Sequence, residues 1–352
     1  MLSFETDSIL EQAMIKIYCP IIVLLLFIIS CKTEKSNDNA LQEPVLIKSS
    51  EIHLRDPFIL ADDKTKTYYL YTSIHNRTQS EGQGVEVYTS TDLQNWTSPK
   101  PVFHVPKKFW AKKYVWAPEV HFYKGKYYLF VTLTSDDLLD NPPEAPTENV
   151  SKFNKRGTQI LVSETLIGHF IPFKNEPHTS IDWMTIDGTF WEEEGQPYMI
   201  YCHEWTQIKN GTVDLITLEN DLSAVKGENQ VLFKGSEAPW VQPIARGTEY
   251  ITDGCYLYKT KTGKLLMIWS SADTKGFSIG IAESESGSVK GPWKHQAKPL
   301  LEKDGLHAMI FETFDGQLVL ALHQPNSNPD ERMQLYKLND TGEQLILQGK
   351  LF

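Results

Sequence analysis

Apolar and polar residues alternate along this chain in a pattern that occurs five times. Each copy has a short opening of small or charged residues, an apolar run, a polar turn and a second aromatic or aliphatic run. The openings lie 54 to 70 residues apart and begin at Asp56, Ala117, Asp187, Asp253 and His307. Short apolar runs bounded by turn residues predict β-strands, and a long regular period of such strands predicts a fold built by radial repetition.

A third strand follows each pair, and its residues also alternate between apolar and polar. These third strands are expected at residues 84–96, 157–164, 211–233, 279–293 and 332–347. About four strands per unit is the content of one propeller blade. The sequence therefore predicts an all-β fold, a five-bladed β-propeller formed as a single domain by residues 48–352. Because the innermost strand of each blade lines the channel, the five openings should converge there.

Composition and charge exclude one class of partner. The 352 residues are 41% hydrophobic and 11% aromatic, which is ordinary for a globular protein with a sizeable core. The formal net charge is -11. Because binding of nucleic acid requires a basic surface, this charge argues against a nucleic-acid partner and leaves a neutral ligand open.

Residues 1–31 are expected to be an export signal. A basic segment that begins at Met14 precedes an apolar run too short to span a membrane comfortably, and three acidic residues before Met14 indicate that translation starts there. The small residue before Cys31 resembles a bacterial lipoprotein cleavage site, at which Cys31 carries the lipid. The alternative is an uncleaved anchor helix. Both predict an exported protein, periplasmic or at the cell surface, whose only membrane contact is this anchor, with residues 32–47 as a disordered tether.

The remaining cysteines do not suggest a disulfide framework. Cys202 and Cys255 both lie within apolar strand segments, so we expect two buried free thiols. The sequence has no Cys-x-x-Cys or His-Glu-x-x-His pattern that would indicate a zinc site.

Three of the five openings carry an aspartate, which makes the repeat a clue to chemistry. Asp56, Asp187 and Asp253 are expected to face one another across the mouth of the channel. Carboxylates a few ångströms apart raise one another's pKa, so they are costly unless a function retains them. Hydrolysis of a glycosidic bond uses one carboxylate as a general base for water and one carboxylic acid to protonate the leaving oxygen. A third carboxylate can keep that acid protonated.

Three phrases carry a family resemblance, namely Arg55-Asp56-Pro57, Trp116-Ala-Pro-Glu119 and Ile186-Asp187-Gly188. In this order and at blade spacing they resemble glycoside hydrolase family 43, five-bladed propeller enzymes that act on arabinose- and xylose-containing polysaccharides. The likeness covers nearly all of the chain after residue 48. It implies that Asp56 is the general base and that Asp187 tunes and orients the acid.

The general acid is where this sequence departs from the family pattern, which places a glutamate before Gly-Pro or Ala-Pro at the inner strand of the fourth blade. Here that strand opens with Asp253, without the proline. Glu237, sixteen residues earlier, stands before Ala-Pro but does not lead directly into the strand. Strand register favours Asp253, whereas side-chain length and the motif letters favour Glu237. We slightly prefer Glu237 as the acid, with Asp253 as a supporting or substrate-binding carboxylate.

Five further residues near the strand openings are candidates for substrate binding. The rings of Trp116 and Trp240 offer flat faces on which a sugar can stack, and Glu119 offers hydrogen bonds to sugar hydroxyls. His203 ends a strand in the third blade and has no assigned role. The family resemblance implies that His307 can approach a channel metal, often calcium, through water; the alternative is a hydrogen-bonded core histidine.

These observations lead to one functional hypothesis and two rivals. The hypothesis is an inverting glycosidase that requires no cofactor and cleaves α-L-arabinofuranosyl or β-D-xylosyl linkages in plant polysaccharide fragments. The first rival is a cell-surface propeller that binds sugar without cutting it, which the altered acid motif keeps open. The second is another five-bladed glycosidase or a glycoside phosphorylase.

Overall fold

The structure is a computed structural model that describes residues 45–74, 82–140, 153–244 and 247–352. The predicted signal segment 1–31, with its start at Met14 and its lipidated Cys31, lies outside the described residues, as does most of the tether predicted at 32–47. Within the described ranges, no helix has the length and apolar character needed to cross a membrane.

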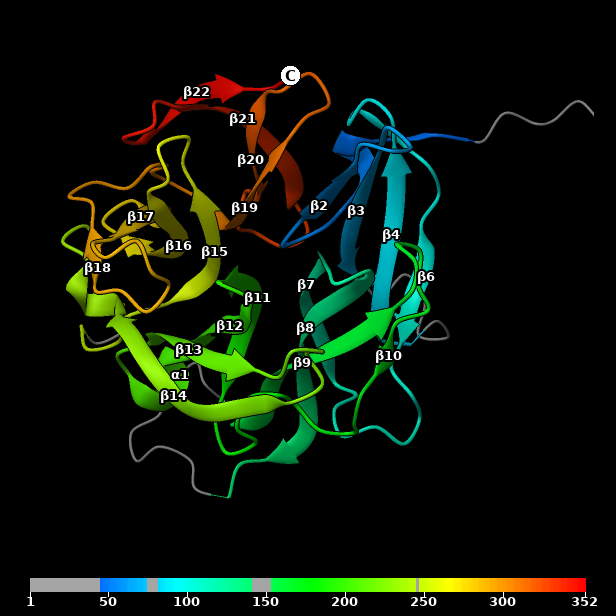
Figure 1. Cartoon of the computed structure of the whole chain (residues 1–352), viewed down its shortest axis with the longest axis horizontal. Coiled ribbons are helices and arrows are strands. Elements are labelled where there is room, and N and C mark those ends of the chain that lie inside the picture. Colours follow the sequence, from blue (N-terminus) through cyan, green and yellow to red (C-terminus); the bar gives the residue numbers. More distant parts are fainter. Residues whose placement is uncertain (1–44, 75–81, 141–152, 245–246) are drawn as a thin grey trace, which may run out of the picture. The chain divides into compact units, whose positions relative to one another are not determined.

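Five four-stranded antiparallel sheets are arranged around a central axis as the blades of a β-propeller (Figure 1). This confirms the predicted all-β, five-bladed fold. The innermost strands, in chain order, are β2 (Phe58–Asp62), β7 (Tyr114–Tyr123), β11 (Thr185–Glu193), β15 (Asp253–Lys259) and β19 (Leu306–Glu312). Each of them contacts the innermost strands of the two neighbouring blades, so together they close a ring around the channel.

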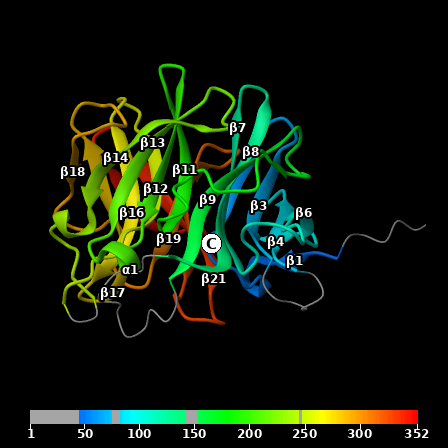
Figure 2. The same cartoon turned by 90° about the horizontal axis from the view of Figure 1, so that it is seen from below.

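The other strands follow outward in each blade. Figure 2 shows the same sheets from the side. The second strands are β3 (Thr67–Ser73), β8 (Lys126–Leu138), β12 (Gln196–His203), β16 (Leu265–Asp273) and β20 (Leu318–Gln324). The third strands are β4 (Gly84–Ser90), β9 (Asn154–Ser163), β13 (Thr212–Leu218), β17 (Gly276–Ser284) and β21 (Arg332–Asp340). The outermost strands are β6 (Lys100–His104), β10 (Ile171–Pro172), β14 (Val225–Lys234), β18 (Trp293–His295) and β22 (Leu345–Lys350). The short elements are β1 (Ile47–Lys48), which pairs with β5 (Asn95–Trp96), the helix α1 (Trp205–Ile208), and the 3-10 turns Ser49–Glu51 and Gly235–Glu237.

Apolar side chains fill the blades and the spaces between them. The largest fully buried side chains are Trp96, which belongs to the core around the first two blades, and Trp269, which belongs to the core around the third and fourth. Cys202 and Cys255 lie in the same cluster as Trp269, buried and free, as expected. The blades thus form a rigid frame that holds the openings of the innermost strands in place.

One backbone feature recurs at the opening of every innermost strand. A single residue there takes a left-handed conformation: Asp56 (φ 48°), Ala117 (φ 45°), Asp187 (φ 59°), Gly254 (φ 54°) and His307 (φ 48°). In the second to fifth blades the pairing with the second strand shifts register at this point. A β-bulge of this kind bends the strand and redirects a side chain, so these five residues hold equivalent positions around the channel.

The position of the left-handed residue corrects the way in which the sequence matched the fourth strand opening to the others. The letters Asp-Gly place Asp253 beside Asp56 and Asp187, but Gly254 holds the left-handed position. A Cβ atom at residue 254 would lie 2.6 Å from Cα of His307, so only glycine fits there. Asp253 therefore stands one residue earlier, at the position held in the other blades by Arg55, Trp116, Ile186 and Leu306.

Candidate active site

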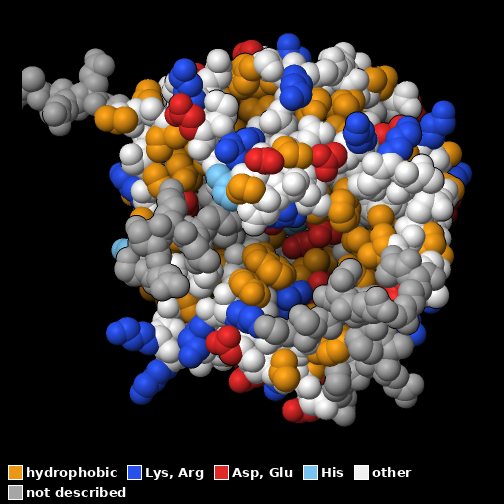
Figure 3. Space-filling model, turned by 180° about the vertical axis from the view of Figure 1, so that it is seen from behind, with side chains coloured by type: hydrophobic (Ala, Val, Ile, Leu, Met, Phe, Trp, Pro, Cys, Tyr) orange, Lys and Arg blue, Asp and Glu red, His pale blue; other side chains and the backbone are white. Residues whose placement is uncertain are grey.

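A cavity of about 520 Å³ lies where the strand openings meet. Figure 3 shows a hollow at the centre of this face, with acidic side chains at its floor. In every blade, the residue directly before the left-handed one lines this cavity: Arg55, Trp116, Ile186, Asp253 and Leu306. The volume falls in the usual range of ligand sites, about 300–1,000 Å³.

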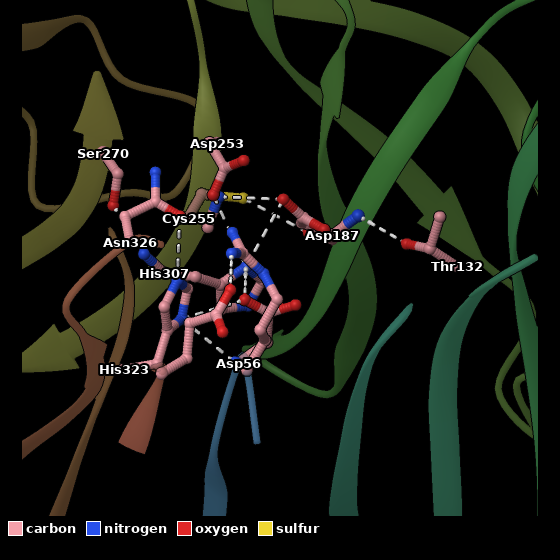
Figure 4. Close-up of polar contacts among 12 residues, drawn as sticks. Asp56, Thr132, Asp187, Asp253, Cys255, Ser270, His307, His323 and Asn326 are labelled. Carbon is pink, nitrogen blue, oxygen red and sulfur yellow. Dashed lines mark hydrogen bonds and ion pairs between the residues drawn. The ribbon is translucent and has the colours of Figure 1, made fainter. Parts of the chain in front are cut away.

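Three carboxylates converge on the imidazole of His307 (Figure 4). Its Nδ1 atom lies 3.5 Å from Asp187 Oδ2, 3.5 Å from Asp253 Oδ1 and 3.9 Å from Asp56 Oδ1. The structure thus brings together the aspartates that the sequence placed across the channel from one another, with a histidine at their centre.

Asp56 is held by a second histidine from the fifth blade. Nδ1 of His323 lies 3.2 Å from Asp56 Oδ1 and 3.1 Å from the backbone nitrogen of the same residue. Nδ1 of His323 can form only one of these two bonds at a time. When it carries no proton it accepts a hydrogen bond from the backbone N–H, and when it is protonated it donates one to the carboxylate. Both arrangements fix the Asp56 side chain at the opening of β2.

Asp187 is fixed by the neighbouring blades. Its backbone N–H donates to Thr132 Oγ1 at 2.8 Å, and its Oδ2 accepts the backbone N–H of Gly254 at 3.0 Å. That second bond connects the third blade to the residue directly after Asp253. Asp187 is therefore placed to set both the charge and the position of Asp253.

The carboxylates and His307 shift one another's pKa values in different directions. Burial disfavours the charged form of His307, but the charges of Asp187 and Asp56 hold its pKa well above the usual value. Burial acts to raise the pKa of Asp56 as well, but His307 and His323 outweigh it and keep that pKa well below the usual range. For Asp253, burial and the charge of Asp187 raise the pKa to about 6, against the opposing effect of His307.

The site therefore holds a charged imidazolium, an ionised carboxylate on Asp56 and a carboxyl on Asp253 that can carry a proton. Two carboxyl groups whose environments push their pKa values apart are suited to divide the roles of base and acid. Asp253 Oδ1 is buried against His307, with Nδ1 at 3.5 Å. The Asp253 side chain as a whole is 21% exposed and lines the cavity, so its carboxyl group can meet a ligand there.

A directly bound calcium does not fit this cluster. Oxygens of Asp187 and Asp253 and a nitrogen of His307 lie within 4.8 Å of one another, which is close enough for shared coordination. Calcium, however, takes six to eight oxygen ligands. Against the effect of burial, the charges of Asp187 and Asp56 hold the pKa of His307 well above its usual value, so a protonated imidazole offsets part of the carboxylate charge.

Glu237 and Trp240, both predicted for the site, lie outside it. The Glu237 side chain is exposed, and its Oε1 accepts the backbone N–H of Lys234 at 3.1 Å, beside the short turn that it ends. Trp240 is 7% exposed and packs in the core, with its ring 5.2 Å from that of Trp269 and against Gly280. Neither lines the cavity, so neither belongs to the site we propose.

Glu119 and His203 do not line the cavity either. Glu119 is 4% exposed and pairs with His121 Nε2 at 2.8 Å. The ring of His203 stacks on Trp183 at 4.6 Å and contacts Gln207 at 2.8 Å. Both polar side chains already have partners, which explains why they do not face a ligand.

Two ion pairs at the cavity were missed by sequence reasoning. Glu331 is fully buried and accepts a hydrogen bond from Arg55 at 2.7 Å, and both line the cavity. Glu204 lines it too and pairs with Arg156. Glu204 directly follows His203, to which the sequence assigned no role. Isolated Arg and Glu residues near strand ends carry no sequence signal for such pairing.

Replacing Gly254 with alanine is expected to damage the site. The new Cβ would lie 2.6 Å from the backbone of His307, which cannot move without displacing the imidazole from the carboxylates. We expect a loss of catalytic activity, measured as kcat, and a destabilisation above the ~1–2 kcal/mol of left-handed backbone alone, measured by urea unfolding. Gly263→Ala is the matched control, because Gly263 has φ 89° and open space around it. Equal effects of the two substitutions would contradict the steric argument.

A propeller with two carboxyl groups of separated pKa values in one ligand-sized cavity offers the kinds of group that acid–base cleavage of a glycosidic bond requires. This arrangement fits a glycoside hydrolase. The sequence profile described as "Glycosyl hydrolases family 43" matches residues 43–349. The chain therefore belongs to this family, whose enzymes hydrolyse O-glycosyl bonds and generally need no cofactor.

Several relatives with known names share this sequence or fold. A solved structure of an endo-arabinase from Bacteroides thetaiotaomicron VPI-5482 is 38% identical, with a TM-score of 0.71, and the match covers 82% of this chain and 95% of that one. An extracellular exo-α-(1→5)-L-arabinofuranosidase of Cellvibrio japonicus is 23% identical over 340 residues, 84% of this chain and 86% of the relative. An extracellular endo-α-(1→5)-L-arabinanase of Bacillus subtilis is 24% identical over 174 residues, 47% of this chain and 48% of the relative, so that match spans about half its length.

Proposed function

We propose that this protein is an inverting hydrolase of α-L-arabinofuranosyl linkages in arabinan fragments, with β-D-xylosyl linkages as the alternative substrate. The observation that carries the proposal is the cluster of Asp56, Asp187 and Asp253 around His307 at the floor of a sugar-sized cavity. Arabinan is favoured over xylan because the relatives named above are arabinan-degrading enzymes.

Each carboxylate has one role in the proposed reaction. Asp56, ionised at any ordinary pH, removes a proton from the attacking water. Asp253 gives its proton to the leaving glycosidic oxygen. Asp187 holds the pKa of Asp253 up by its charge and fixes the backbone beside it. Asp253 takes the acid role instead of Glu237, because Glu237 is exposed outside the cavity.

The stereochemical outcome can be measured directly. Inverting enzymes hold their two carboxyl groups about 6.5–9.5 Å apart, to leave room for a water. Oδ1 of Asp56 and Oδ1 of Asp253 lie 3.9 Å and 3.5 Å from the same nitrogen of His307, so these two oxygens are at most about 7.4 Å apart, toward the lower end of that range. Purified wild-type protein should release arabinose or arabino-oligosaccharides, and proton NMR of the first product should show the inverted anomer. A retained anomer would overturn the base role of Asp56, and no cleavage of arabinan, xylan or their oligosaccharides would overturn the function.

The pH profile follows from the two pKa shifts. Asp56, with a lowered pKa, stays ionised, whereas Asp253 must be protonated and loses its proton as the pH rises through about 6. We therefore expect kcat/KM for arabino-oligosaccharides to be level on the acid side and to fall about tenfold per pH unit above pH 6. Initial rates between about pH 4 and 8 will show this limb. A profile that rises with pH through this range would be inconsistent with Asp253 as the acid.

We also propose that the protein is exported and anchored by a lipid on Cys31. The two relatives from Cellvibrio and Bacillus are named as extracellular, and Ser30-Cys31 follows an apolar run typical of an export signal. In a bacterial host fed an alkyne fatty acid, wild-type protein should be labelled and Cys31→Ser should not. Equal labelling of both would refute the anchor.

A further inference from the structure

The guanidinium of Arg156 lies over the ring of Trp116. The Cζ atom of Arg156 lies 4.4 Å from the ring centroid, a distance typical of a cation–π contact. The ring of Tyr114 lies parallel to that of Trp116, with an interplanar angle of 13° and 5.4 Å between centroids. The face that Arg156 covers is not available to a sugar, so the sugar-stacking role predicted for Trp116 does not apply to that face.

Arg156 is held in this position from two sides. It lies near the start of β9, and its Nε donates a hydrogen bond to Thr134 Oγ1 on the neighbouring strand β8 at 3.0 Å. Its Nη1 donates to Glu204, which follows β12 in the next blade. The pair therefore joins the second blade to the third, with the guanidinium plane fixed by Trp116.

Glu204 is equally fixed, and it faces the cavity. Its backbone N–H donates to the carbonyl of Met184 at 2.8 Å, and its own carbonyl accepts the N–H groups of Gln207 and Ile208 in the turn of α1. The side chain is 7% exposed and lines the same cavity as Asp253. Burial raises the pKa of Glu204, while the charge of Arg156 opposes that rise and that of Asp253 adds to it.

A buried ion pair needs an explanation beyond stability, because desolvating two charges commonly costs as much as their attraction returns. Only Oε2 of Glu204 and two nitrogens of Arg156 have hydrogen-bond partners among the described residues. Neither Oε1 of Glu204 nor Nη2 of Arg156 is among the fully enclosed atoms without a partner. Glu204 and Trp116 line the cavity, and the guanidinium of Arg156, whose side chain is 10% exposed, contacts both of them. One acceptor on Glu204 and one donor on Arg156 are thus left without a partner among the described residues.

We propose that Arg156 and Glu204 form a clamp for a pair of neighbouring hydroxyl groups on one sugar unit of the substrate. Glu204 accepts a hydrogen bond from one hydroxyl, and Arg156 donates to the oxygen of the other. The inference rests on the proposed function, since it places a sugar in this cavity. It makes Glu204 and Arg156 determinants of specificity, and Trp116 the residue that positions Arg156.

Binding to an inactive variant tests the clamp without depending on which group is the acid. α-1,5-Linked arabinotetraose is titrated calorimetrically into Asp56→Asn, and into the same variant with Glu204→Gln added. Glutamine keeps the shape and a bond to Arg156 but loses the charged acceptor, so affinity should fall about ten- to a hundredfold. The melting temperature should change little. Glu237→Gln, an exposed residue outside the cavity, is the matched control and should bind like the parent.

A second variant separates binding from structure. Arg156→Met/Glu204→Met removes both charges together, which commonly leaves stability near its original value. It should fold and lose the same affinity. With active Asp56, Glu204→Gln should raise KM more than it lowers kcat.

The outcomes distinguish the clamp from the function on which it rests. Affinity within about threefold of the parent in both clamp variants would overturn the clamp, while cleavage of arabinan by the wild type would still stand. Binding without any cleavage by the wild type would overturn the hydrolase function and leave the clamp to be decided by the same titrations. No binding of arabinotetraose by the parent would overturn the clamp for this substrate, while the hydrolase function would still be decided by the cleavage of arabinan and xylan.

Discussion

Asp56→Asn should lower kcat by about 10²–10⁴-fold, the usual contribution of a general base. The ionised carboxylate is the group that removes a proton from water, and an amide at the same place cannot do so. The substitution should not disturb the fold, because Asp56 has φ 48° and asparagine tolerates this left-handed conformation as well as aspartate does. Turnover of arabino-oligosaccharides and the far-UV circular dichroism spectrum measure the two effects.

A control substitution at an exposed carboxylate separates the loss of the general base from unrelated effects on activity. Glu237→Gln changes an exposed carboxylate outside the cavity and should keep wild-type kcat. A kcat for Asp56→Asn within a few fold of wild type would rule out Asp56 as the base. A comparable loss in both variants would point to impurity or instability rather than chemistry.

The fold was predictable because the same physical pattern is written five times. Each blade needs an apolar inner strand, a turn and a second apolar strand, and these runs are long enough to be recognised without an alignment. The convergence of Asp56, Asp187 and His307 followed from the fold, since strand openings in a closed propeller must meet at its axis. Repetition thus carries positional information as well as shape.

In the fourth blade, the residue letters alone did not predict which residue opens the strand. The letters Asp-Gly occur at Asp187 and at Asp253, but the left-handed residue is the aspartate in one blade and the glycine in the other. Which residue takes that conformation depends on the neighbour across the blade interface, here the backbone of His307 against Gly254. A contact between residues more than fifty positions apart leaves no local trace in the sequence.

The sequence also did not predict which way individual side chains near the strand openings point. Trp240 stands beside an expected strand opening, yet it packs on Trp269 in the core, because Gly280 leaves room for its ring there. Glu204 lines the cavity just after the end of β12, and its partner Arg156 comes from β9 in another blade. The sequence could name which residue types the chemistry needs, but packing between blades decided which of them reach the cavity.

The role of Asp253 should appear most clearly as a dependence on the leaving group. Asp253→Asn should lower kcat/KM for arabino-oligosaccharides by about 10²–10⁴-fold, because the departing sugar oxygen is a poor leaving group without a proton. For a 2,4-dinitrophenyl arabinofuranoside, whose phenolate leaves unprotonated, the same substitution should cost far less. The wild-type decline in kcat/KM above about pH 6 should also disappear with this substrate.

Asp253→Glu completes the argument, because it restores the residue that the family pattern places in this blade. The longer side chain carries the same proton one methylene further into the cavity, so activity on oligosaccharides should be retained or raised. Glu237→Gln should affect neither substrate. Equal losses of Asp253→Asn on both substrates would instead assign Asp253 to holding His307 and the sugar in place, and the proton would then have to come from another group in the cavity wall.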